Sequence, residues 1–95
     1  MYVAVASFSS RWVDKDLDKI IKYVDKQNNN GAYNKYFVVE LNDRDWGIYQ
    51  KSRQFQGCTP TIVYDPFNVG ERYIRASNMY SNGFVRTFGS RSGDH

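Results

Sequence analysis

The segment covering residues 2–8 (YVAVASF) has apolar side chains on both faces of an extended chain. Val3 and Val5 alternate with Ala4 and Ala6, which is typical of a strand that is buried on both sides of a sheet. The pattern therefore predicts that the first strand is central.

The hydrophobic pattern then changes to a helical period. Apolar residues three and four positions apart define one face, and they are Val13, Leu17, Ile20, Ile21 and Val24. Aspartates precede lysines along this segment, which suits the helix dipole because negative charge is favourable near a helix N-terminus. Residues 27–31 (QNNNG) favour turns and left-handed backbone. We expect a helix that starts at Val13 and ends in this polar run.

The next two segments predict a strand and a helix. In residues 34–41 one face consists of Phe37, Val39 and Leu41, and the other of Tyr36, Val38 and Glu40. Residues 42–57 admit two interpretations, a hairpin return or a short helix. Acidic residues at the start, basic residues near the end and the closing Gly57 favour the helix, although Gly47 weakens it by about 1 kcal/mol relative to alanine.

The C-terminal part is predicted to add two strands and a helix. Residues 59–65 (TPTIVYD) read as a third strand with proline at its entrance. Residues 71–76 (ERYIRA) would return as an antiparallel fourth strand with Ile74 facing inward. Residues 79–88 would form a weak last helix. The expected domain spans residues 1–89, and residues 90–95 are a polar tail.

This order of elements predicts an α/β or α+β fold of one domain. Crossovers through two helices imply that the first three strands are parallel, with the fourth added antiparallel at an edge. The expected architecture is a mixed four-stranded sheet flanked by helices.

Composition and charge narrow the functional classes only slightly. The chain has 95 residues, of which 41% are hydrophobic and 17% aromatic, enough for one core. We find no segment with the length of a membrane span and no signal-peptide pattern, so a cytoplasmic location and no membrane partner are expected. The net charge of +3 fits an anionic partner but does not identify one.

Two local sequences resemble the thioredoxin family. Residues 8–17 (FSSRWVDKDL) are similar to the thioredoxin segment in which an aromatic strand end, three residues and a tryptophan precede Cys-x-x-Cys at a helix start. Phe8 and Trp12 are the matching positions. Residues 59–65 are similar to the family's strand that opens with a cis proline followed by a threonine, here Pro60 and Thr61.

The resemblance implies a thioredoxin-like βαβαββα fold and a cis peptide bond before Pro60. The redox cysteines of the family are absent, because Val13 and Asp16 stand at their places and Cys58 is the only cysteine. Dithiol exchange needs two thiols, so the sequence excludes thioredoxin and glutaredoxin activity.

The remaining polar residues offer little catalytic chemistry. Cys58 admits a single-thiol role such as glutathionylation, but a lone cysteine is more often a small buried hydrophobic residue. Asp14 and Asp16 fit helix capping better than metal binding. His95 is the only histidine, and we expect no catalytic residue, metal site or cofactor.

The sequence therefore favours a non-catalytic, redox-inactive binding protein, an adaptor or an inhibitor, and its compactness suggests a phage or other mobile-element origin. Eight tyrosines, six phenylalanines and two tryptophans exceed the needs of one small core, and Tyr, Trp and Arg are enriched at binding hot spots. The expected partner is a protein, bound through Trp12, Val13, Asp14, Cys58, Thr59, Pro60, Arg72 and Arg75. One alternative is single-stranded nucleic acid bound on an aromatic and arginine surface. A second alternative is a redox role of Cys58.

Overall fold

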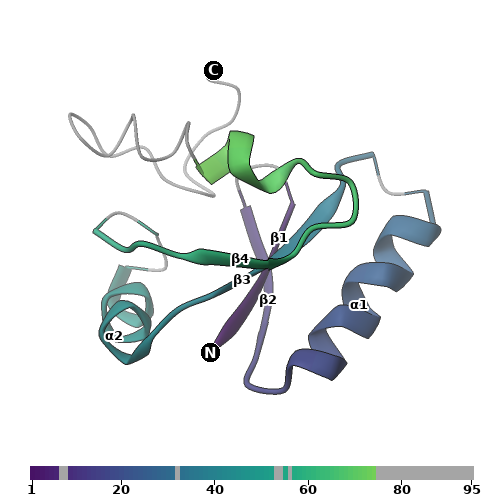
Figure 1. Cartoon of the computed structure of the whole chain (residues 1–95). Coiled ribbons are helices and arrows are strands. Elements are labelled where there is room, and N and C mark those ends of the chain that lie inside the picture. The colour runs from purple at the N-terminus through teal and green to yellow at the C-terminus, as the bar shows by residue number, and fades with distance from the viewer. Residues whose placement is uncertain (7–8, 32, 53–54, 56, 75–95) are drawn as a thin grey trace.

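The computed structural model describes residues 1–6, 9–31, 33–52, 55 and 57–74. Within them, the elements in chain order are β1 (Tyr2–Ala6), β2 (Ser9–Asp14), α1 (Leu17–Asn29), β3 (Tyr36–Glu40), α2 (Asp43–Ser52) and β4 (Thr61–Tyr64). Residues 70–74 are also helical. The four strands form one sheet in the order β2-β1-β3-β4, with α1 on one face and α2 on the other (Figure 1). The expected α/β class with a four-stranded sheet flanked by helices is confirmed.

The first strand is central, as its sequence predicts. β1 lies between β2 and β3. Val3 and Val5 belong to the hydrophobic core under α2, while Ala4 and Ala6 belong to the core under α1. All four side chains are fully buried, so the alternating valines and alanines serve two separate cores.

The direction of the strands differs from the expectation. β1 pairs antiparallel with β2 and with β3, and β3 pairs antiparallel with β4. The prediction of three parallel strands in a mixed sheet is therefore wrong, because every neighbouring pair of strands in this sheet is antiparallel. The cause is the additional strand β2, which reverses the chain before α1, so that α1 connects β2 to the parallel β3 across the intervening β1.

The predicted start of the first helix at Val13 is also wrong. Val13 lies in β2 and packs against the core on the α2 side of the sheet. α1 begins only at Leu17, where the Asp16 carboxylate accepts hydrogen bonds from the backbone nitrogens of Asp18 (3.0 Å) and Lys19 (3.4 Å). Asp16 is thus a helix cap, as the sequence indicates. The predicted left-handed ending is confirmed at Gly31, whose φ is +78°.

Residues 42–57 contain the predicted helix rather than the hairpin. The helix α2 begins after Asn42, whose side-chain oxygen accepts from the backbone nitrogen of Asp45 at 2.8 Å. The chain leaves β3 at Glu40 and enters β4 at Thr61, and these two residues are paired. The segment with α2 therefore brings the chain back to the edge of the sheet where β3 ends, and β4 starts there and runs antiparallel to β3.

The predicted fourth strand over residues 71–76 is wrong, because residues 70–74 are helical. The Asp65 carboxylate accepts from the backbone nitrogens of Val69 (3.0 Å) and Gly70 (2.8 Å), which satisfies the first amides of this turn. Residues 75–76, the predicted helix over residues 79–88 and the polar tail lie outside the described residues.

The peptide bond between Thr59 and Pro60 is trans, since the described residues contain no cis peptide. The cis bond implied by the resemblance to thioredoxins is therefore absent. The antiparallel pairing of β1 with β3 also differs from the strand directions expected from that resemblance.

Candidate functional site

A β-bulge in the edge strand β2 shapes the candidate site. The pairing of β1 with β2 runs from Ala4 opposite Trp12 to Val5 opposite Ser10, so Arg11 is the extra residue. Because of this residue, the consecutive side chains of Arg11 and Trp12 lie on the same face of the sheet, the face covered by α1. A regular strand would send them to opposite faces.

On the α1 face, Arg11 and Trp12 belong to a group of side chains that we call the edge cluster, together with Tyr23 and Tyr36. The ring of Trp12 stacks on Tyr23 with centroids 5.5 Å apart, and Tyr23 meets Tyr36 edge-on at 5.9 Å. The guanidinium carbon of Arg11 lies 5.8 Å from the centroid of the Tyr36 ring. These contacts hold the Trp12 ring in place while 52% of the residue stays exposed.

The Tyr23 hydroxyl at the centre of the edge cluster stays protonated at neutral pH. Burial raises the pKa of Tyr23, and the neighbouring Tyr36 raises it further, while the charge of Arg11 acts in the opposite direction. The edge cluster therefore presents neutral aromatic surface and one positive charge.

The other face of the bulge carries a hollow of about 330 Å³, which we call the β2 hollow. It is lined by Ser10, Arg11, Trp12, Val13 and Tyr49. Ser10 and Val13 are successive side chains on this face, because the two residues between them point toward α1. The bulge thus puts two residues instead of one between Ser10 and Val13 on this face, and the hollow lies beside Tyr49. At the hollow, the hydroxyl oxygens of Ser10 and Tyr49 are 2.6 Å apart.

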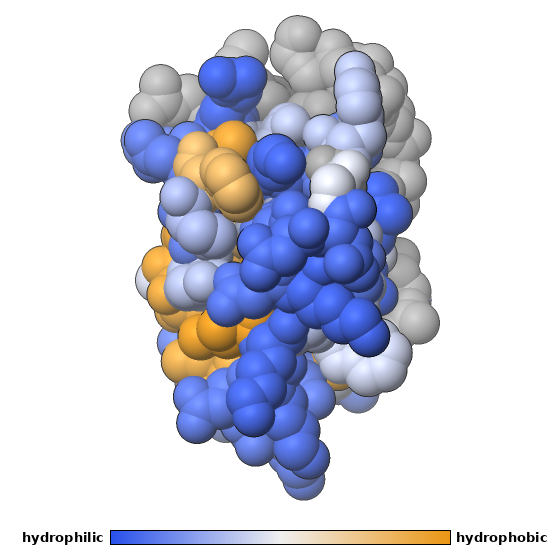
Figure 2. Space-filling model, turned by 90° about the vertical axis from the view of Figure 1, so that its right-hand side faces the viewer, coloured by the Kyte–Doolittle hydropathy of each residue, from blue (hydrophilic) through white to orange (hydrophobic). Residues whose placement is uncertain are grey.

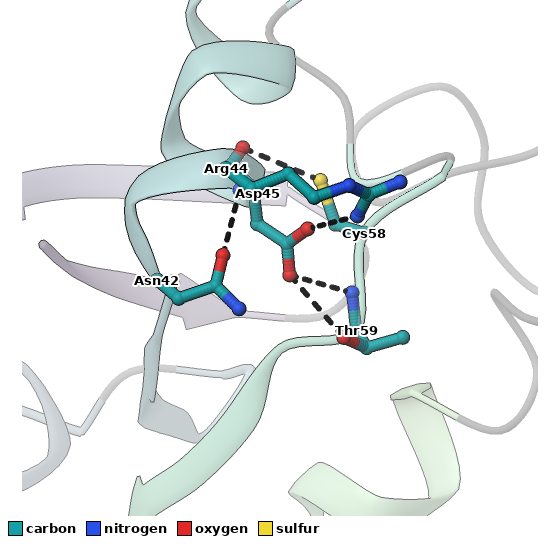
Figure 3. A network of polar contacts seen from close by, with 5 residues as sticks. All are labelled: Asn42, Arg44, Asp45, Cys58 and Thr59. Carbon is teal, nitrogen blue, oxygen red and sulfur yellow. Dashed lines mark hydrogen bonds and ion pairs between the residues drawn. The ribbon is translucent and has the colours of Figure 1, made fainter.

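A second polar group lies at the start of α2 (Figure 3). The Asp45 side chain is fully buried, and its carboxylate accepts from the Thr59 backbone nitrogen at 2.9 Å and from the Thr59 hydroxyl at 3.3 Å. Arg44 donates to the other carboxylate oxygen at 2.8 Å. This network fixes the segment before β4 to α2, so Asp45 does more than supply negative charge at the start of the helix.

Cys58 lies in the same network and is buried, with 4% of the residue exposed. Its thiol lies 3.5 Å from the Asp45 backbone oxygen. Burial, and secondly the charge of Asp45, raises the pKa of the Cys58 thiol to about 11. The thiolate needed for nucleophilic chemistry is therefore scarce at neutral pH, which favours the interpretation of Cys58 as a buried core residue.

The residues predicted to bind a partner do not form one surface. Trp12 and Val13 lie on β2 at one edge of the sheet, and Thr59 and Pro60 precede β4 at the other edge. Three strand spacings separate the edges, or roughly 14 Å. The Asp14 carboxylate is used within the turn before α1, where it accepts from the Asp16 nitrogen at 2.8 Å.

The arginines predicted to join this surface lie elsewhere. Arg72 is exposed in the helical residues 70–74, and Arg75 lies outside the described residues. The sequence analysis did not predict Ser10 and Arg11 as site residues. Their positions depend on the bulge, and no local sequence pattern predicts the bulge.

The described residues contain no group of three His, Cys, Asp or Glu side chains that could hold a metal ion. None of the helices among them is long and apolar enough to cross a membrane. Comparisons with protein-family models, with curated proteins and with solved structures gave no significant match.

Proposed function

We propose that the chain is a non-catalytic binding protein, an adaptor or an inhibitor, that recognises a protein partner through the edge cluster and the adjoining β2 hollow. The observation that carries the proposal is the Trp12 ring, which is half exposed yet held by stacking on Tyr23. A tryptophan fixed in this way loses little conformational entropy on binding and offers a large apolar area, as hot-spot residues do. The proposal does not depend on a thioredoxin-like fold.

The distribution of charge favours a protein over nucleic acid as the partner. The described residues carry nine basic and nine acidic side chains, so the excess of three positive charges comes entirely from the remaining residues. On the face of α1 the hydrophilic surface is continuous (Figure 2), but it mixes Asp18 with Lys19, Lys22 and Lys26. Together with Asp25, these make five charged residues in α1, three lysines and two aspartates, with a net charge of only +1, which gives a weak attraction for a phosphate backbone.

The test is selection of binding peptides from a displayed random library, with the full-length protein as bait. The affinity of the selected peptides is then measured by fluorescence anisotropy for the wild type, Trp12→Ala and Phe67→Ala. Phe67 is a matched control, because it is an aromatic residue 48% exposed that follows β4 at the opposite edge.

We expect Trp12→Ala to weaken binding about tenfold or more and Phe67→Ala to leave it within about twofold. Thermal unfolding of both variants checks that the fold is retained. Equal affinities of the wild type and Trp12→Ala, or a library from which nothing binds, would contradict the proposed function. Binding of single-stranded oligonucleotides that is steeply salt-dependent and sensitive to Trp12→Ala would support the nucleic-acid alternative.

A further inference from the structure

The charged side chains of α1 are sorted by side, although their net charge is small. Tyr23 marks the side toward β2, since its ring stacks on Trp12. Asp25 marks the side toward β4, since its carboxylate accepts a hydrogen bond from the Tyr64 hydroxyl. The two sides face opposite edges of the sheet, because β2 and β4 are its outer strands.

Lysines lie beside Tyr23 on the β2 side of the helix. Residues three or four positions apart are neighbours on a helix surface, and Lys19 and Lys26 lie four positions before and three positions after Tyr23. Both lysines are exposed. Asp18 lies about two turns before Asp25 and therefore shares its side. The side of α1 that adjoins the edge cluster is thus basic, and the acidic side faces away from it.

Arg11 adds a third positive charge beside these lysines. Its guanidinium lies over the ring of Tyr36 on the α1 face, and the residue is exposed. Within the described part of the chain, neither Arg11 nor the two lysines form an ion pair with a carboxylate. Asp14 and Asp16 accept hydrogen bonds from backbone nitrogens in and after the turn before α1. The three cations therefore lie in or beside the edge cluster with their charge available to a partner.

We propose that the protein partner places an aspartate or glutamate on Arg11, on the α1 side of the sheet, next to an apolar side chain that covers the exposed part of Trp12. This inference rests on the proposed function and adds the chemistry of the partner. A guanidinium group binds a carboxylate through two parallel N–H donors, and it can do so while it stacks on an aromatic ring. Lys19 and Lys26 attract the same carboxylate over a longer range.

A carboxylate side chain fits this arrangement better than a nucleic-acid strand. A strand carries one charge per nucleotide, so its affinity depends on how many phosphates the protein neutralises. The three cations are bordered by four aspartates, which are Asp14, Asp16, Asp18 and Asp25, and these repel a strand that extends along α1. One or two carboxylates can remain within the basic side.

The experiment uses library peptides whose binding depends on Trp12, acetylated and amidated at their ends. Each acidic residue is replaced in turn, aspartate by asparagine or glutamate by glutamine. Affinities are measured by fluorescence anisotropy for the full-length wild type and for Arg11→Met. At one acidic position we expect the replacement to weaken binding to the wild type about tenfold, as loss of one charged hydrogen bond implies. The same replacement should change binding to Arg11→Met by less than about twofold.

Two further variants separate the charge of Arg11 from its packing on Tyr36. Arg11→Lys keeps the charge and should keep a preference of roughly threefold for the acidic peptide. Arg72→Met is the matched control, because Arg72 is an exposed arginine in the helical residues 70–74, which pack on the α2 side of the sheet. This control should keep the full preference. Thermal unfolding checks that each variant retains the fold.

The inference is overturned if the Trp12-dependent peptides contain no acidic residue, or if every replacement costs the same in the wild type and in Arg11→Met. Either result leaves the proposed function intact, because that function depends on Trp12. Peptides that all bind independently of Trp12 would contradict the proposed function, whatever the effect of Arg11→Met. Short single-stranded oligonucleotides are titrated in parallel. If they bind more tightly than the peptides and lose this binding in Arg11→Met, the inference is overturned in favour of nucleic acid.

Discussion

The Asp45 carboxylate accepts a hydrogen bond at 2.9 Å from the backbone nitrogen of Thr59, fourteen residues later in the chain. This bond and the second one from the Thr59 hydroxyl tie the first turn of α2 to the segment that enters β4. The Asp45 side chain is fully buried, so its partners cannot be replaced easily by water. The contact holds together two segments that the local sequence leaves independent.

We expect Asp45→Ala to lower the free energy of unfolding by about 1–3 kcal/mol, because it leaves the Thr59 N–H without its acceptor. Urea denaturation followed by circular dichroism measures the effect. Asp43→Ala is the matched control, since Asp43 lies in the same helical turn but is exposed, and it should cost less than about 1 kcal/mol. Equal losses in both variants would show that the helix dipole, rather than the bond to Thr59, accounts for the effect.

A second buried side chain, Asn28, joins the end of α1 to the start of β3. Its side-chain oxygen accepts from the Tyr36 nitrogen at 2.8 Å, and its side-chain nitrogen donates to the Tyr36 oxygen at 3.2 Å. We expect Asn28→Ala to reduce stability by about 2 kcal/mol, because two backbone groups lose their partner. Asn29→Ala, at the next and exposed position, should change it by less than about 0.5 kcal/mol. A stable Asn28→Ala protein in chemical denaturation would refute this role.

Two glycines should respond to alanine in opposite directions. A Cβ atom at Gly70 would lie 2.9 Å from a ring carbon of Phe37 and 3.0 Å from Ile62, whereas one at Gly47 meets nothing within 4 Å. Gly70→Ala should therefore destabilise the fold by about 1–3 kcal/mol through overpacking. Gly47→Ala lies inside α2 and should stabilise it by about 0.5–1 kcal/mol. Melting temperatures that move in the same direction for both variants would contradict this reading of the packing.

The Cys58 thiol should react slowly in the folded protein. Its pKa is raised by burial from 9.0 to about 11, so the thiolate fraction at pH 8 falls about a hundredfold. Labelling with iodoacetamide at pH 8 should be slower by at least this factor in buffer than in concentrated urea. Rapid labelling of the folded protein would restore the single-thiol redox role as a candidate function.

The same shift predicts how stability changes with pH. Below pH 9 the thiol is protonated in both states and has no effect. Between pH 9 and about 11 the unfolded chain loses this proton first, so the free energy of unfolding falls as pH rises. The comparison of wild type with Cys58→Ala at pH 8 and pH 10 isolates the effect from tyrosines, whose ionisation is common to both proteins. A pH dependence that Cys58→Ala leaves unchanged would contradict the shift.

The local sequence was sufficient for the elements whose signals come from their own residues. The alternation in β1 and β3 reports burial on two faces, and both strands have the predicted inward residues. The Asp16 cap and the left-handed Gly31 were likewise readable, because capping and positive φ depend on one or two neighbouring residues. The helix α2 was favoured by its charge order, and it is present.

Pairing between distant strands was not readable in this way. β2 begins with polar residues, so its sequence does not show the alternation typical of a strand. Val13 fits the spacing of a helix and that of a strand equally well. Because the sequence analysis did not predict β2, it predicted the wrong direction of β3 relative to β1. β2 reverses the chain before α1, so β3 runs antiparallel to β1 and not parallel to it. The strand predicted over residues 71–76 was wrong because of a contact with an earlier residue. The Asp65 carboxylate accepts from the backbone nitrogens of Val69 and Gly70 and so caps a helical turn at this place.

The sequence by itself determined the α/β class, the two-sided burial of β1, the position of the caps and the absence of a thiol pair, because each follows from residue types or from short spacings. Only the tertiary structure decided where the candidate site lies. The bulge at Arg11 arises from the register between β1 and β2, which is a property of two strands together. It turns Arg11 and Trp12 to one face of the sheet, and the β2 hollow lies beside it. Thr59 and Pro60 lie at the opposite edge, because β1 and β3 separate β2 from β4.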